Sequence, residues 1–111
     1  MILGIDYGEK WCGVAESEGS LARPLKVVPT KNIFAEIEKL KPAKVVVGIS
    51  ENAMAKKTLV FVKKLKVWIK APVETVDETL TSIEAQKIKK KKADQHAVAA
   101  ALILNRYLDK I

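Results

Sequence analysis

The sequence predicts an α/β fold: a mixed five-stranded sheet, built from an antiparallel three-strand meander plus parallel strands and flanked by helices. Residues 1–28 contain three apolar stretches separated by short turn signals, which is the pattern of strands joined as hairpins. From Thr30 onward, helical patterns alternate with short apolar strands, which is typical of parallel strands joined by crossover helices. At 111 residues the chain is long enough for one core but not for two, so residues 1–111 are expected to form a single domain.

The meander is predicted over residues 1–8, 11–16 and 21–28. Short polar or glycine-containing segments at 9–10 and 18–20 supply the turns between these strands. Pro24 has no N–H to donate, which places the third strand at an edge of the sheet or at a bulge.

The second half of the chain begins with a helix at Thr30, whose hydroxyl is expected to cap the first turn. The run Val45-Val46-Val47 is apolar throughout and predicts a central parallel strand that is buried on both faces. The remaining predicted elements are a helix over 53–66, a strand over 73–76, a helix capped by Thr81, and a last helix that is capped by Asp94 and apolar over 97–104.

The composition is basic, with 20 Lys and Arg against 13 Asp and Glu and a formal charge of +7. Such an excess favours a polyanionic partner such as nucleic acid, although basic surfaces also serve solubility. No apolar run has membrane-spanning length and no signal peptide is recognisable, so no membrane partner and a cytoplasmic location are expected. Cys12 is the only cysteine, which excludes an intramolecular disulfide and a cysteine metal cluster.

Asp6 is the first candidate for a functional residue, because it lies within an apolar strand and not in a polar loop. A carboxylate there is costly unless a cation, a metal or hydrogen bonds satisfy it. Gly4 and Gly8 flank Asp6, so backbone or ligand can approach it closely. The structural alternative is that Asp6 only begins a turn with Gly8.

Three further candidates lie elsewhere in the chain. Glu78 follows the strand over 73–76, at the strand end where open α/β sheets place their ligands. Asp94 and His96 begin the last helix. Carboxylates that converge with Asp6 would repel one another without divalent cations, which could bridge them and support attack on a phosphodiester. Alternatively, Glu78 and Asp94 are helix caps, and His96 is a buried, hydrogen-bonded histidine.

Several segments of the sequence resemble the YqgF family, also called RuvX, which has a ribonuclease H-like fold related to that of the RuvC Holliday junction resolvases. The resemblance covers the whole chain, and its most distinctive motif is Val-Asp-Glu-Thr-Leu-Thr-Ser-Ile-Glu-Ala at 76–85. The other matching segments are 2–10 with 13–15, 45–48, and 99–104 with 107–109.

The resemblance implies a nuclease that depends on Mg²⁺ or Mn²⁺ and acts on structured RNA or branched DNA. Members of the family are described as Holliday junction resolvases and as nucleases that mature the 5′ end of pre-16S ribosomal RNA. By position, Asp6 takes the first catalytic carboxylate and Glu78 the second, and both are expected to ligate metal. The expected phosphate contacts are Lys10, Lys89, Lys90, Lys91 and Lys92.

The sequence departs from the family pattern at three places. Thr79 replaces an arginine, which removes one phosphate contact, and the loop after Gly48 is shorter than usual. The last catalytic aspartate of the family falls at His96, while Asp94 lies two residues too early. Some RuvC-type enzymes use a histidine in this helix, so His96 is predicted to contact the metal or its water and Asp94 to be chiefly structural.

Three functions are compatible with these residues. The first is the metal-dependent nuclease. The second is a nucleic-acid-binding protein of the same fold that does not cleave, which the missing aspartate favours. The third is an actin-like or sugar-kinase ATPase, which needs a second similar domain that 111 residues cannot supply. Resolution of a symmetric junction would require a homodimer, whereas trimming of RNA would not.

Overall fold

The computed structural model describes residues 1–49, 54–77 and 92–110, and the side chains of residues 54 and 92–94 lie outside that description. The predicted helix that begins at Thr81 lies outside the described residues. The observed elements are β1 (Ile2–Asp6), β2 (Trp11–Ser17), β3 (Arg23–Pro29), a short 3-10 helix η1 (Thr30–Asn32), α1 (Ile33–Leu40), β4 (Lys44–Ile49), α2 (Met54–Trp68), β5 (Val73–Asp77) and α4 (Lys92–Asp109).

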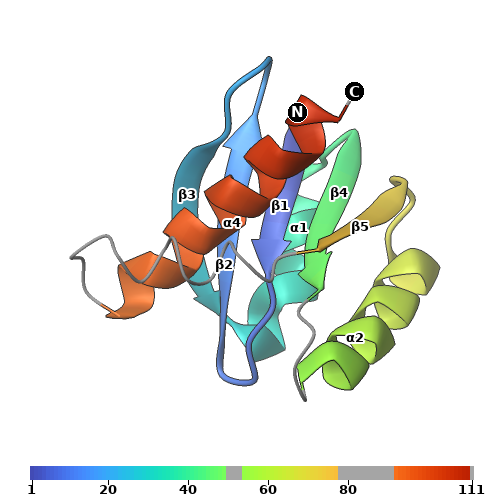
Figure 1. The fold of residues 1–111 in the computed structure, drawn as a ribbon. Coiled ribbons are helices and arrows are strands. Elements are labelled where there is room, and N and C mark those ends of the chain that lie inside the picture. The colour runs from blue at the N-terminus through green and yellow to red at the C-terminus, as the bar shows by residue number, and fades with distance from the viewer. Residues whose placement is uncertain (50–53, 78–91, 111) are drawn as a thin grey trace.

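The five strands form one mixed sheet in the order β3-β2-β1-β4-β5 (Figure 1). Strands β1, β2 and β3 are antiparallel, whereas β4 runs parallel to both β1 and β5. This is the predicted meander followed by parallel strands. It also explains the run of three valines in β4, because Val45, Val46 and Val47 are fully buried between layers on both faces.

Pro24 lies on β3 at the edge of the sheet, as its missing N–H predicted. The pairing of β3 with β2 also shifts between Val14 and Ala15, since Val14 pairs with Lys26 and Ala15 pairs with Pro24. Both alternatives offered by the sequence, an edge strand and a bulge, are therefore present at this proline.

Two helical layers cover the sheet. Helix α4 crosses one face, and α1 and α2 lie on the other (Figure 1). The face toward α1 and α2 buries Leu3 and Ile5 of β1 with Ile33, Ile37 and Leu65 of the helices. The face toward α4 buries smaller side chains, which are Ala15, Ala100 and Ala101 together with Val46, Val76, Ile103, Leu104 and Tyr107.

Two predicted helix caps are wrong. The Thr30 hydroxyl does not cap a helix: it donates to the Gly8 carbonyl at 2.7 Å, and neither η1 nor α1 has a side-chain cap. Helix α4 begins at Lys92, so Asp94 lies in its first turn and not before it. An acidic residue in the first turn still interacts favourably with the helix dipole, which is why the sequence pattern did not distinguish the two positions.

Candidate active site

Asp6 is the last residue of β1 and pairs with Gly13 of β2. Alternation along the strand places its side chain on the same face as Gly4, which contacts α4. The carboxylate is only 14% exposed. A buried carboxylate at the end of a central strand needs a cation or hydrogen-bond donors, as the sequence suggested.

His96, near the beginning of α4, supplies one such partner. Its Nδ1 lies 3.1 Å from Asp6 Oδ2, and the imidazole is 33% exposed. The predicted proximity of His96 to the strand that carries Asp6 is confirmed. If Nδ1 carries the proton, it donates to the carboxylate and leaves Nε2 as the nitrogen with which the ring could ligate a metal.

Glycines allow α4 to approach the sheet this closely. A Cβ on Gly13 would lie 1.8 Å from the His96 carbonyl oxygen, and one on Gly4 would lie 2.7 Å from the Ala100 carbonyl oxygen. Neither glycine has a positive φ, so what these positions require is space and not an unusual backbone conformation. The absence of a side chain at Gly13 therefore determines how closely the first turns of α4 approach the strand end that carries Asp6.

Replacement of Gly13 by alanine should separate His96 from Asp6. The clash is with backbone, so α4 must shift, and we expect a loss of about 1–3 kcal/mol in the free energy of unfolding. The histidine Nδ1 chemical shift and its titration by NMR would report the loss of the Asp6 contact. The matched control is Gly19→Ala, because a Cβ at Gly19 meets nothing within 4 Å. An Nδ1 signal in Gly13→Ala identical to that of the parent chain would contradict this role of Gly13.

The turn after Asp6 is held by hydrogen bonds from Thr30, the first residue of η1. The Thr30 hydroxyl donates to the Gly8 carbonyl, and the Thr30 N–H donates to the Lys10 carbonyl at 3.0 Å. Cys12 Sγ lies 3.4 Å from Thr30 Oγ1. Burial raises the pKa of the Cys12 thiol, and the nearby Asp6 carboxylate adds to the rise, so this cysteine stays protonated and structural at neutral pH.

The end of β5 is tied to α4 by an arginine that the sequence reasoning missed. Arg106 Nη1 donates to the Asp77 carbonyl at 2.8 Å. Asp77 pairs with Ile49 and Asp6 is one step past the Ile5–Val47 pair, so the strand ends that carry Asp6 and Asp77 lie at the same edge of the sheet. Arg106 thus fixes the last residue before Glu78. The signal that could have revealed it is an arginine within the otherwise apolar last helix.

The other predicted site residues are only partly described. Glu78, Lys89, Lys90 and Lys91 lie outside the described residues. Lys10 is exposed in the turn between β1 and β2. Lys92 and Asp94 lie in the first turn of α4. Among the side chains that the structure describes, those of residues 1–49, 55–77 and 95–110, no three potential metal ligands are grouped together, so within them the site consists of Asp6 and His96.

The donor set suits the divalent cation that the family resemblance implies. A buried carboxylate is an oxygen donor that Mg²⁺ and Mn²⁺ prefer, and an imidazole nitrogen is acceptable to Mn²⁺. The pair lies at the carboxyl end of β1, where open α/β sheets bind their ligands, and the His96 side chain is 33% exposed there. Among the described residues, no helix is long and apolar enough to cross a membrane.

The chain is similar to known proteins along its whole length. A relative from Thermotoga maritima is 36% identical over 113 residues, which cover 98% of this chain but 50% of that protein. A relative from Bordetella pertussis is 33% identical over 123 residues and covers 97% of this chain and 92% of its own length. Both carry the name "Putative pre-16S rRNA nuclease".

A solved structure has the same fold. Thermus thermophilus RuvC in complex with a Holliday junction substrate superposes with a TM-score of 0.61 over 98% of this chain and 94% of that chain, at 17% identity. The predicted ribonuclease H-like fold is confirmed. The model of the RuvX family, described as Holliday junction resolvase, matches residues 1–110, and the chain therefore belongs to the RuvX family.

Proposed function

We propose that this protein is a divalent-metal-dependent nuclease whose substrate is structured nucleic acid, with the 5′ end of pre-16S ribosomal RNA as the first candidate. The observation that carries the proposal is the largely buried Asp6 carboxylate, paired with His96 at the end of β1 in a chain of the RuvX family. The names of the relatives favour ribosomal RNA over a DNA junction. Such a substrate would place the reaction in the cytoplasm.

In this proposal Asp6, Glu78 and His96 hold the cation, and Asp94 supports the first turn of α4. When bound, Mg²⁺ or Mn²⁺ supplies an activated water and stabilises negative charge on the leaving oxygen. The chain's own contribution is to fix the donors: Gly13 sets the distance of His96 from β1, His96 orients the Asp6 carboxylate, and Arg106 fixes the end of β5.

A cleavage panel tests this proposal. Precursor 16S rRNA, a four-way DNA junction, duplex and single-stranded DNA would be incubated with the pure protein in Mg²⁺, in Mn²⁺ and in chelator. Metal-dependent cleavage of the rRNA precursor near its mature 5′ end is the expected result. Selective cleavage of the junction would assign the chain to resolution, which would require a homodimer with two active sites.

The second candidate is a protein of the same fold that binds nucleic acid without cleaving it. One specific feature favours it: an imidazole at position 96 brings no negative charge to the site, where the family pattern has an aspartate. Tight binding without cleavage on every substrate, in both metals, would select this function.

The lysines at 89–92 are proposed to bind phosphate without reading bases. Replacing Lys89, Lys90, Lys91 and Lys92 with alanine should weaken binding to every nucleic acid tested and reduce the slope of log K against log salt by about 3. The matched control removes four exposed lysines elsewhere, which are Lys31, Lys39, Lys66 and Lys110. An equal loss of slope in the control would show that only net charge matters.

A further inference from the structure

Helix α2 presents an unusual surface to solvent. It carries five lysines and no acidic residue. Several of its large apolar side chains are also exposed, most of all Val67 at 84% and Trp68 at 68%. An exposed tryptophan forgoes the stabilisation that burial would give, so its position on a basic helix points to a partner.

Two hollows lie between α1 and α2 and follow one another along the helices. The first adjoins the turn after Asp6 and is lined by Tyr7, Thr30, Phe34, Lys57, Phe61 and Lys64. The second, about 500 Å³ in volume, lies at the far ends of the helices and includes Ile37, Lys41, Trp68 and Lys70. Lys64 and Trp68 are one helical turn apart, as are Phe34 and Ile37 on the facing helix, so the two hollows form one path. We call this path the α1–α2 groove.

The α2 side of the groove combines lysines with an exposed tryptophan. Lys57, Lys64 and Trp68 follow a single edge of α2, because spacings of seven and four residues return to the same face. Lys41 and Lys70 add two positive charges at the far end, where Glu38 is the carboxylate among the lining residues. Lys57 forms an ion pair with Glu9 of the β1–β2 turn, and within the described part of the chain the other α2 lysines form none.

We propose that the α1–α2 groove binds a single-stranded segment of nucleic acid beyond the cleavage site, with phosphates on Lys57, Lys64 and Lys41 and a base stacked on Trp68. Stacking of bases on aromatic side chains beside basic residues is how proteins hold single strands without reading sequence. Lys57 and Trp68 are 11 residues apart on α2, or about 16 Å. That path suits a strand of at least about 4 nucleotides.

A second copy of the chain fits this surface less well. Two α2 faces brought together would oppose lysine to lysine, and like charges at an interface are costly. The inference rests on the proposed nucleic-acid function. It extends that function to the face of the sheet opposite α4, which the strand would reach by passing over the end of β1.

Binding without cleavage tests the groove. A fluorescein-labelled single-stranded RNA of about 12 nucleotides would be titrated with the protein in chelator, and anisotropy would give Kd at several salt concentrations. Trp68→Ala should raise Kd by roughly 5- to 100-fold, and Trp68→Phe should retain most of the affinity. Lys64→Ala should reduce the salt slope by about 0.7, the value for one phosphate of a single strand.

The controls lie on the same helix. Val67→Ala removes a neighbouring exposed apolar side chain, and Lys66→Ala removes a lysine from the opposite edge of α2. Both should bind like the parent chain. Equal affinity in the parent and Trp68→Ala would contradict binding in the groove, as would no binding of this RNA by the parent chain. Neither result bears on the nuclease proposal, which the cleavage panel tests separately.

Two other results would also contradict the proposal that the α1–α2 groove binds single-stranded nucleic acid. If Trp68→Ala dissociates a dimer of the parent chain in sedimentation, the face is an interface between copies. If Trp68→Ala abolishes binding to vesicles of anionic phospholipid but not to RNA, the face is a membrane contact.

Discussion

Asp6→Asn is expected to abolish metal-dependent cleavage, with a loss of at least about 1,000-fold in rate, or ~4 kcal/mol of transition-state stabilisation. The substitution keeps the shape of the side chain and an oxygen that can accept from His96 Nδ1, but removes the negative charge that a cation needs. Because the hydrogen bond survives, the free energy of unfolding in chelator should change by less than about 1 kcal/mol. Initial rates in Mg²⁺ and Mn²⁺, together with chemical denaturation, measure the two quantities.

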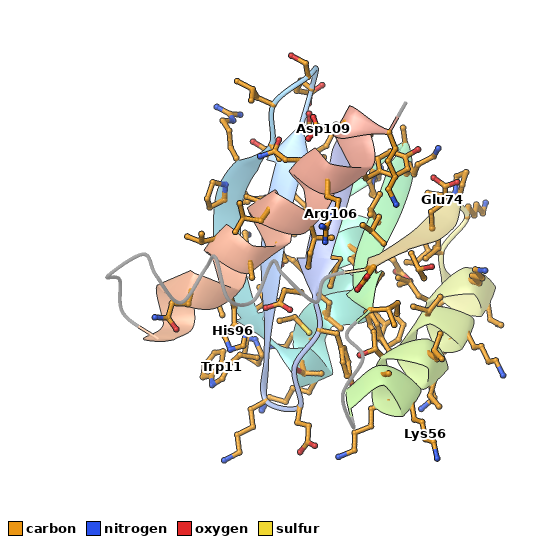
Figure 2. All side chains as sticks on the ribbon, in the orientation of Figure 1. Trp11, Lys56, Glu74, His96, Arg106 and Asp109 are labelled. Carbon is orange, nitrogen blue, oxygen red and sulfur yellow. The ribbon has the colours of Figure 1, made fainter. Side chains whose placement is uncertain are left out.

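The control for this variant is Asp109→Asn, which makes the same chemical change at an exposed position at the end of α4 (Figure 2). It should cleave at the parent rate. Full activity of Asp6→Asn would remove the nuclease proposal. RNA binding in chelator should be similar in both variants, because neither residue lies in the α1–α2 groove.

The sequence predicted the sheet well because its signals are local. The run of three valines identified the central parallel strand, and the missing N–H of Pro24 identified the edge and the bulge. The prediction that Thr30 caps a helix was wrong for a different reason. The Thr30 hydroxyl finds its acceptor on Gly8, 22 residues away, and no local pattern reports a contact made by the tertiary fold.

The site could be predicted in part. Burial of Asp6 followed from its place within an apolar strand, and the small residues of α4 predicted that His96 would face that strand. Two other features join segments that are far apart in the chain. They are the close approach of the His96 backbone to Gly13 and the hydrogen bond from Arg106 to the Asp77 carbonyl of β5. Their precise register depends on how α4 docks, which the sequence pattern does not specify.

A series at position 96 separates two tasks that the histidine could perform. His96→Ala removes both the hydrogen bond to Asp6 and any ligand nitrogen, so activity should fall by about 10- to 100-fold. His96→Asn places an amide N–H near the position of Nδ1 and can still donate to Asp6, but it offers no counterpart of Nε2. If His96 contacts the metal or its water, as we propose, His96→Asn should be as impaired as His96→Ala. Activity near the parent rate in His96→Asn would show instead that His96 only orients Asp6.

The same series tests the charge of the site. His96→Asp restores the carboxylate of the family pattern and should retain or raise affinity for Mn²⁺, measured by calorimetry on the intact chain.

Asp94→Ala is the neighbouring control: it removes an acidic residue from the first turn of α4, and should cost about 0.3–1 kcal/mol of stability while most activity remains. Loss of activity in Asp94→Ala with activity kept in His96→Ala would reverse the assignment. An inactive parent chain that gains cleavage on His96→Asp would identify the imidazole as the reason that this protein binds nucleic acid without cutting it.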